Sequence, residues 1–521
     1  MSNQNQSSTR AALLSLKRFF LGYSKDEPLG STPHLLAWRS WKWFIIATVV
    51  LGIYVDIFLY GSTVVVLPFL LENQAGVSHD DIGKWTGYSM LTYSLASLIS
   101  SPIAGFVADK APNRRLPLLV GLLFLCVGCF CLWFARNITT LLMGRFLQGV
   151  SAGFVWSIGL ALIADTVGVH EVGELLSYAD ISLCFGLASA PPISGLVLKA
   201  CGKNAVYGLV MGLIVLDIVM RLFLIERQAA ERFQSTSVDE ETGINDQKDS
   251  TDGQDLSSQA TSDMGKDSSY MEHVAIPLKS LRVFGALVGT WAVAHILISI
   301  DVLVPIYCEE QYGWGPLQVG LLLLVFYGPS LLCILTGRLA DREHDGKWLA
   351  IGGFLGCIPS FLGLAAIHSI SETEASLTMW FLMACAGISL SFANTPVMAE
   401  VVYALMDKQD RYPSLRRNAG GYGMAYGMFM TVFSLGSATA SAGSPHFLEL
   451  GGNAWAAAMY SLAASCLFAV VPVAMFTGPK PSCGRPFARR RPLLAPETIS
   501  MDQIKGGEVL VMSEEVVSRT V

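Results

Sequence analysis

The chain has 521 residues, of which 52% are hydrophobic and only 15% are charged, and its net charge is −6. An average soluble protein carries about 25% charged residues, and a single water-facing core stops growing at about 300 residues. Together with a mean hydropathy of +0.49, the composition excludes one soluble globular domain and indicates an integral membrane protein. The charge gives no sign of nucleic-acid binding.

Twelve apolar runs are long enough to cross a bilayer as helices, since crossing takes about 20 apolar residues. They lie at 43–71, 85–108, 116–135, 140–164, 172–200, 205–225, 282–308, 316–340, 348–369, 376–406, 418–442 and 452–477. A long polar stretch separates the first six from the last six. We therefore expect an all-α membrane protein with two six-helix bundles, 43–225 and 282–477.

Three polar segments lie outside these bundles: an N-terminal tail, 1–42, a central linker, 226–281, and a C-terminal tail, 478–521. The linker is rich in Ser, Asp, Gln and Gly, so it cannot bury enough apolar area to offset its ordering entropy, and we expect disorder. Lys and Arg gather in the loops on the same side as these segments. The positive-inside rule then places them in the cytosol. We expect the plasma membrane, with a vacuolar or vesicular membrane as the alternative.

No metal, cofactor or enzymatic activity is expected. Cys126 and Cys129 lie in an apolar run with no His or charge nearby, so we interpret them as packing residues. The sequence contains no P-loop, no G-x-S-x-G and no H-E-x-x-H. Any transport across the membrane would therefore have to draw its energy from a gradient.

The two halves repeat one signature at the same place. Gly105 to Lys110 follows the second predicted span, and Gly337 to Arg342 follows the eighth, each with a Gly-x-x-x-Asp pattern and later basic residues. An Asp at a helix end can cap a neighbouring helix or pair with an Arg, and repeated halves are typical of secondary transporters. We interpret both segments as gating loops, with Gly105, Asp109, Arg114, Gly337, Asp341 and Arg342 as their functional residues.

The first of these segments resembles the loop signature of the major facilitator superfamily. The fourth predicted span carries Arg145…Gln148-Gly149, which resembles the superfamily's fourth-helix motif, whose Arg is linked to proton coupling. The fifth span is similar to the antiporter motif of drug:proton antiporters, through Gly186, Pro191, Pro192 and Gly195. The resemblance covers about 43–477 and implies two bundles that rock around a central cavity.

Within the superfamily the chain is most similar to the vesicular-amine-transporter branch and its fungal efflux relatives. The first span's Asp56…Gly61…Pro68, and Asp217…Arg221…Glu226 at the close of the sixth span, carry this similarity. Two differences argue against amine exchange. Amine carriers have a carboxylate in the tenth span, where Asn394 stands, and another in the eleventh, near Met430.

Ionisable and strongly polar side chains inside the predicted spans are few. A charge at mid-bilayer costs about 2.5–3.5 kcal/mol, so each one is retained for a reason. Our candidates for proton coupling or substrate binding are Asp56, Arg145, Gln148, Asp301, Asn394 and Glu400.

We interpret Asp56 as the proton-exchanging carboxylate, because desolvation makes it easier for a carboxylate to hold a proton. The alternative is a structural carboxylate satisfied by a hydroxyl or an Arg. For Arg145 the alternative is an arginine that snorkels at the cytosolic boundary.

Two further features concern the shape of the predicted cavity. Pro191 and Pro192 remove backbone hydrogen bonds from the fifth helix and should kink it. Tyr422 and Tyr426 lie one turn apart in the eleventh span, and we expect them to face the cavity as stacking groups.

These patterns predict a monomeric secondary transporter whose partners are a small-molecule substrate, protons and the lipid bilayer. Our leading hypothesis is a proton-coupled antiporter that exports a small organic compound, such as a secondary metabolite, toxin or drug. One alternative keeps the fold and reverses the task, as proton-coupled uptake or vacuolar loading. Another is a non-transporting receptor or scaffold, which would require a folded motif in the linker that the sequence does not show.

Overall fold

The computed structural model describes residues 33–233 and 280–478, apart from 34, 75, 79–81, 112, 168–170, 228, 232, 344, 368–371, 412–421 and 449–453. The chain divides into two compact units, Met1–Gly478 and Pro479–Val521, and all the described residues belong to the first. Most of the predicted tails and of the predicted linker therefore lies outside the described residues, and the end of the N-terminal tail contributes the short helix α2 (Leu36–Arg39). Every regular element within the described residues is helical.

The first half contains six long helices preceded by the short α2 (Leu36–Arg39). The long helices are α3 (Lys42–Asn73), α4 (Ile82–Lys110), α5 (Arg115–Trp133), α6 (Ile138–Val167), α7 (Val172–Cys201) and α8 (Lys203–Phe223). The second half begins with α11 (Leu281–Tyr312) and continues with α14 (Lys347–Ala365), α15 (Glu372–Arg411), α17 (Tyr422–Leu448) and α18 (Ala454–Phe476). Its second crossing is made of α12 (Pro316–Tyr327), the 3₁₀ turn η2 (Gly328–Leu332) and α13 (Cys333–Glu343).

Eleven helical segments among the described residues are long and apolar enough to cross a membrane. The remaining predicted span, 418–442, is the eleventh in chain order and corresponds to α17, which has 27 residues but carries many Gly, Ser and Thr residues. This helix packs against α4 of the first half and α11 of the second, which takes its small and polar residues away from lipid. The prediction of an all-helical membrane protein with two six-helix halves is confirmed.

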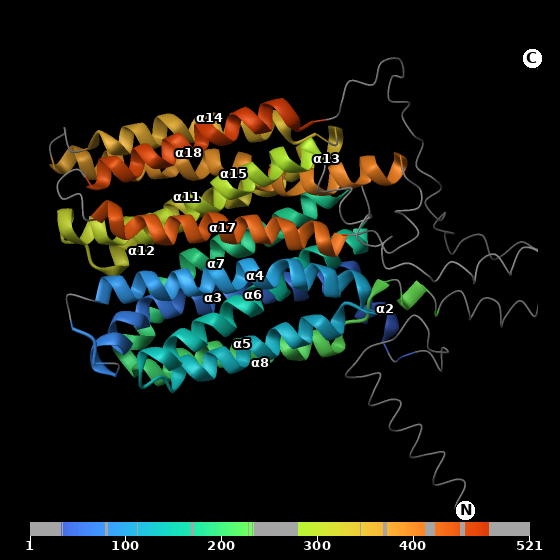
Figure 1. Cartoon of the computed structure of the whole chain (residues 1–521), viewed down its shortest axis with the longest axis horizontal. Helices are drawn as coiled ribbons and strands as arrows, with labels where there is room; N and C mark the ends of the chain where they lie inside the picture. The colour runs from blue at the N-terminus through green and yellow to red at the C-terminus, as the bar shows by residue number, and fades with distance from the viewer. Residues whose placement is uncertain are drawn as a thin grey trace, which may run out of the picture. The chain divides into compact units, whose positions relative to one another are not determined.

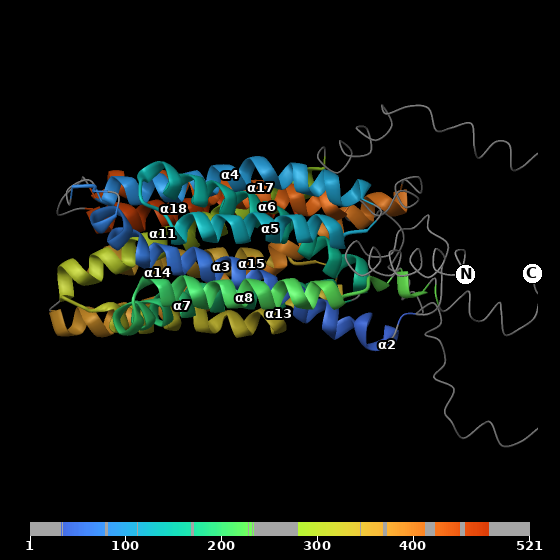
Figure 2. The ribbon, with the colours of Figure 1, turned by 90° about the horizontal axis from the view of Figure 1, so that it is seen from below.

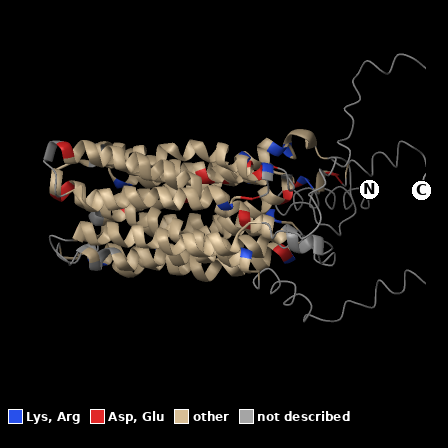
Figure 3. Cartoon of the chain, turned by 90° about the horizontal axis from the view of Figure 1, so that it is seen from above, with Lys and Arg blue, Asp and Glu red and all other residues tan. Residues whose placement is uncertain are grey.

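The helices of this unit run side by side along one axis (Figures 1 and 2). Most acidic and basic residues of the helices gather toward the end that holds α2, whereas the middle of the bundle is nearly free of them (Figures 1 and 3). We call this end, where α5 and α14 begin, the charged end. It is the end that the positive-inside rule predicts to face the cytosol.

The two halves meet mainly in two places. In one, α4 packs against α17, and in the other, α7 packs against α12 and α13. Glycines permit the closest approaches. A Cβ placed on Gly105 of α4 would lie 2.5 Å from the carbonyl oxygen of Gly423, and one on Gly337 of α13 would lie 2.4 Å from that of Gly173. A backbone cannot yield as a flexible side chain does, so these positions need glycine for the halves to touch.

The structure moves two predicted boundaries. Gly105 and Asp109 lie inside α4, and Gly337, Asp341 and Arg342 lie inside α13, so the predicted gating loops are largely the last turns of helices. Glu226, which we assigned to the linker, is instead part of the folded bundle. Its carboxylate accepts hydrogen bonds from the backbone N–H groups of Arg114 (2.6 Å) and Arg115 (3.2 Å) at the start of α5.

Candidate functional site

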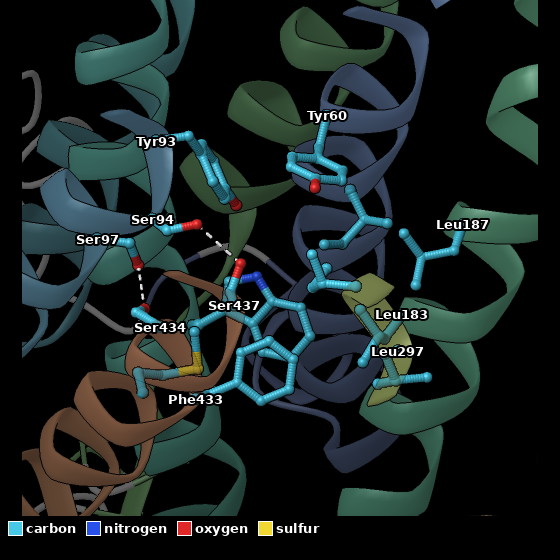
Figure 4. A pocket seen from close by; sticks show the side chains of 14 residues that line it. Tyr60, Tyr93, Ser94, Ser97, Leu183, Leu187, Leu297, Phe433, Ser434 and Ser437 are labelled. Atoms are coloured by element: carbon cyan, nitrogen blue, oxygen red, sulfur yellow. Dashed lines mark hydrogen bonds between the residues drawn. The ribbon is translucent and has the colours of Figure 1, made fainter. Parts of the chain in front are cut away.

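A small cavity lies between the two halves, lined by α3, α4, α6, α7, α11 and α17 (Figure 4). One side of the lining carries hydroxyl groups, from Tyr60, Tyr93, Ser94, Ser97, Ser434 and Ser437. The other side is aliphatic, with Leu183 and Leu187 from α7 and Leu297 and Ile298 from α11. None of the lining side chains is charged.

Contacts between the halves close this cavity. Ser94 and Ser97 of α4 are each hydrogen-bonded at 2.8 Å to a serine of α17, Ser437 and Ser434 respectively. Trp156 of α6 stacks on Phe433 of α17 with ring centroids 6.3 Å apart. The cavity volume is about 30 Å³, roughly the volume of one water molecule and well below the ~300 Å³ or more of pockets for drug-sized ligands. An organic substrate can enter only when the halves part.

Asp56, the leading sequence candidate, lies beside this cavity in the middle of α3. It is fully buried, and its Oδ2 accepts hydrogen bonds from the Tyr93 hydroxyl (3.4 Å) and the Trp156 indole N–H (3.3 Å). Both donors line the cavity. Its Oδ1 has no hydrogen-bond partner among the described residues, and no basic side chain there forms an ion pair with it. The alternative, a structural carboxylate satisfied by a hydroxyl or an Arg, is met at Oδ2 by the Tyr93 hydroxyl of α4, whereas Oδ1 is left without a partner among the described residues.

Arg145 and Gln148 face the same region from α6, and both side chains are fully buried. The Arg145 guanidinium donates to the Ser89 hydroxyl (3.0 Å) and to Gln148 Oε1 (2.9 Å). It also lies 5.5 Å from the ring centroid of Tyr60. These contacts rule out the snorkelling arginine. Moreover, α6 begins at the end of the bundle opposite the charged end, so Arg145 is not at the predicted cytosolic boundary.

Two tyrosines connect Arg145 to Asp56. The ring of Tyr60, which faces the guanidinium, lies 5.0 Å from the ring of Tyr93, and the Tyr93 hydroxyl donates to Asp56. The aromatic side chains of Tyr60 and Tyr93 therefore lie between the guanidinium and the carboxylate, and no direct salt bridge joins the two groups.

Asp301 of α11 repeats part of this arrangement in the second half. Its Oδ1 accepts a hydrogen bond of 2.6 Å from the Tyr327 hydroxyl of α12, and its Oδ2 has no partner among the described residues. In both halves, then, an Asp on the first helix receives a Tyr hydroxyl from the second crossing. Tyr327 lines a second, smaller cavity that shares Leu297 with the central one.

That second cavity contains Asn394 of α15 and a carboxylate that the sequence analysis missed, Asp180 of α7. The Asn394 amide donates to Asp180 Oδ1, and the Thr395 hydroxyl donates to Oδ2 at 2.8 Å. The available signal was an acidic residue about two turns inside the apolar run 172–200, and our list of buried charges left it out.

Glu400, another sequence candidate, is buried but lines neither of the two cavities. Its Oε2 accepts a hydrogen bond of 2.7 Å from Arg282 Nε, and its Oε1 accepts one of 3.0 Å from the backbone N–H of Gly346, next to the start of α14. The same kind of contact occurs at the start of α5, where Glu226 is the acceptor. The structure therefore places Glu400 in a structural ion pair near the charged end.

The residues of the repeated signature join the halves at the charged end. Asp109 accepts hydrogen bonds of 2.9 Å from the backbone N–H groups of Gly423 and Met424. The Arg114 guanidinium forms ion pairs with two carboxylates: Nη2 lies 3.6 Å from Asp109 Oδ1, and Nε lies 2.5 Å from Asp165 Oδ2. Asp109 thus caps the start of α17, a helix of the opposite half.

Asp341 has the equivalent role in the second half. It accepts hydrogen bonds of 2.8 Å from the backbone N–H groups of Gly173 and Glu174, at the start of α7, and one of 2.7 Å from the Tyr403 hydroxyl. Arg342, by contrast, is exposed.

The antiporter-like segment of α7 is one continuous helix through Pro191 and Pro192. A Cβ on Gly186 would lie 2.7 Å from Ile57 of α3, whereas one on Gly195 would meet nothing within 4 Å. Only the first of the two glycines is needed for close packing. Pro192 contacts α12 of the other half, where a Cβ on Gly320 would lie 3.4 Å from the proline ring.

The cavity aromatics differ from those we expected. Tyr426 is fully buried and packs against Phe429 with ring centroids 6.2 Å apart, and Tyr422 lies one turn closer to the charged end. Neither lines the central cavity; the aromatic residue that α17 contributes there is Phe433. Helical periodicity placed an aromatic face on α17 correctly, but not the depth at which the cavity lies.

Comparisons with known proteins agree with this architecture. Residues 43–415 match the Major Facilitator Superfamily. The chain is 28% identical over 408 residues to an uncharacterized MFS-type transporter, C18.02, of Schizosaccharomyces pombe, covering 75% of this chain and 87% of that protein. It is also 28% identical over 186 residues to a probable vesicular acetylcholine transporter-B of Danio rerio, covering 35% and 38%.

Among solved structures, the human organic anion transporter MFSD10 (TETRAN) is similar, with a TM-score of 0.57, 16% identity, and coverage of 84% of this chain and 100% of that one. At this identity the likeness shows the fold. The repeated halves, the two inter-half helix caps and the sequence match lead to one conclusion. The chain belongs to the Major Facilitator Superfamily and is a multi-pass secondary transporter of the membrane.

Proposed function

We propose that the chain is a proton-coupled antiporter that exports a small organic compound, with Asp56 exchanging a proton for substrate. The observation that carries this proposal is the environment of Asp56. It is a fully buried carboxylate with no basic partner among the described residues, held by two side chains that themselves line the cavity. Any ligand that displaces Tyr93 or Trp156 changes the hydrogen bonds of this carboxylate, which couples binding to protonation.

The lining supports a particular substrate class. A cavity with no charged wall residue, one hydroxyl-bearing side and one aliphatic side suits a neutral or weakly cationic and largely apolar compound with hydrogen-bonding groups on one edge. Secondary metabolites, toxins and drugs are compounds of this kind. In this proposal the Arg145 guanidinium, which lies over the Tyr60 ring, helps to hold the Tyr60–Tyr93 pair beside Asp56.

The helix caps at the charged end support the rocking of two rigid halves. Asp109 and Asp341 hold that end together, while the serine pairs and the Trp156–Phe433 stack close the cavity. Opening toward the charged end breaks the two caps, and opening toward the other end leaves them in place. The protonation state of Asp56 then determines which end of the bundle opens after the substrate is released.

The test uses the purified full chain in proteoliposomes. A panel of neutral and weakly basic aromatic compounds is first screened for binding by thermal shift, and the best binder then serves as the transported compound. An imposed pH gradient should drive its movement by the wild-type chain. Asp56→Asn should abolish the gradient-driven component and leave binding measurable, whereas Asp56→Glu should retain part of it. Gradient-driven transport that is unchanged in Asp56→Asn would contradict the proposal.

A further inference from the structure

Asp180 is the buried carboxylate that the mechanism above does not use. It lies on α7, about two turns from the charged end of that helix, and only 3% of it is exposed. It therefore sits between the Asp341 cap, at the start of α7, and the central cavity. No basic side chain pairs with it in the part of the chain that the structure describes.

Every hydrogen-bond partner of Asp180 is neutral, and most come from the opposite half. Asn394 and Thr395 of α15 and Cys333 of α13 donate to its two oxygens, with the Cys333 Sγ 2.9 Å from Oδ2. Its own helix contributes only the more distant thiol of Cys184, at 3.9 Å. Oδ1 and Oδ2 are both occupied, which distinguishes this carboxylate from Asp56 and Asp301.

This geometry has a consequence when the halves part. The three donors on α13 and α15 move with the second half, while Asp180 moves with the first. The carboxylate then loses all its partners except Cys184, and only water or a ligand can replace them. A buried carboxylate without hydrogen-bond donors is energetically unfavourable. The closed arrangement of the halves and the hydrogen bonds that Asp180 accepts therefore depend on each other.

We propose that Asp180 is a second coupling residue, which holds the halves closed through Asn394, Thr395 and Cys333 and must exchange these donors for water in each transport cycle. Asp180 is a positioning residue, since it acts on the cavity through the arrangement of the two halves. The proposal rests on the proposed function only in assuming that the halves move. Whether Asp56 carries the proton does not affect it.

The experiment measures closure without measuring transport, so that the two proposals can fail separately. The full-length chain in lipid nanodiscs is treated with N-ethylmaleimide, and the alkylation of each cysteine is followed by mass spectrometry. Cys333 is only 1% exposed and lies between the halves, so its thiol reacts when they part. Cys129 and Cys466 are buried within the first and second half respectively, and they report loss of fold.

Three changes test the inter-half contact. Asp180→Asn should raise the alkylation rate of Cys333 at least fivefold, because the charge-assisted hydrogen bonds are lost. Thr395→Val should also raise it, because it removes an inter-half donor to Asp180 while the carboxylate and the Cys333 thiol both remain. The double variant D180N/N394D returns a carboxylate to the pair from the opposite half and should restore slow alkylation. Asp217→Asn is the matched control, since Asp217 is equally buried but pairs with Arg221 within one helix.

The outcomes separate clearly. Faster reaction of Cys333 in Asp180→Asn and Thr395→Val, with rescue by the double variant and no change in Asp217→Asn, supports the proposal. A Cys333 rate within twofold of wild type in both single variants overturns it. So does an equal acceleration at Cys129, Cys333 and Cys466, since the whole fold would then have loosened, and so does failure of the double variant to slow the reaction.

Discussion

Asp109 and Asp341 occupy equivalent places in the two halves, and each accepts two backbone hydrogen bonds from the first turn of a helix in the opposite half. The N-terminus of a helix carries a partial positive charge and free N–H groups, so a carboxylate there is stabilised on both counts. The two contacts are reciprocal: the first half caps α17 and the second half caps α7. Two separate contacts between the halves therefore stabilise the closed arrangement at the charged end.

Neutralising either cap should loosen the charged end. Asp109→Asn or Asp341→Asn loses hydrogen bonds to a charged group, each worth about 1.5–3 kcal/mol, which corresponds to tenfold or more in the ratio of closed to open molecules. Hydrogen–deuterium exchange should rise at the starts of both α7 and α17 in either variant, because rigid halves part together. A rise confined to the one helix start that has lost its cap would contradict rigid-body rocking.

Gly337→Ala should prevent the same end from closing. The new methyl group would lie 2.4 Å from the Gly173 carbonyl oxygen and 2.7 Å from its carbon, and neither is a movable side chain. We expect faster hydrogen exchange at the start of α7 and a transport rate at least tenfold lower. Gly212→Ala on α8 is the control, since a Cβ there meets nothing within 4 Å and should change neither measurement.

Arg145→Lys should impair transport although the charge is kept. Lysine cannot reproduce the planar fork that donates to Ser89 and Gln148 while lying over Tyr60. We expect gradient-driven transport to fall about tenfold or more, from the loss of hydrogen bonds worth about 1.5–3 kcal/mol. Ser89→Ala removes one of these partners and should give a smaller decrease. Full activity of Arg145→Lys would mean that the guanidinium geometry does not matter.

Glu400→Gln should affect stability rather than binding. It leaves the guanidinium of Arg282 without its carboxylate, and breaking a buried pair in this way costs about 3–5 kcal/mol. The midpoint of thermal unfolding should fall by several degrees. The affinity of the folded protein for a compound from the binding screen should stay within twofold of wild type. A large loss of affinity would return Glu400 to the substrate site, where the sequence analysis had placed it.

The fold was predictable because eleven spans among the described residues are marked by their length and hydropathy, and because the Gly-x-x-x-Asp pattern recurs half a chain later. Contacts between residues that are distant in the sequence were not predictable. Nothing near Asp109 in the sequence points to Gly423, and nothing near Asp341 points to Gly173. The depth of the cavity was equally hidden, since Tyr426 and Phe433 share one helix and only packing decides which of them meets the ligand.

The candidate carboxylates show the same limit. A buried acid is visible in sequence, but its partner is not, so Asp56 and Glu400 looked alike until the structure placed Arg282 beside only one of them. Asn394 drew attention because amine carriers have a carboxylate at that position. In this chain the carboxylate that meets Asn394 comes from α7, as Asp180.

The weak hydropathy of α17 bears on how the protein is made. This helix is long enough to cross a bilayer, but it is not among the eleven described segments that are apolar enough to do so by composition alone. Its place between α4 and α11 gives it protein neighbours where lipid would otherwise be. During biosynthesis α17 should therefore enter the bilayer only together with α18 or with the earlier helices. A chain cut short after Leu448 should leave this segment outside the bilayer.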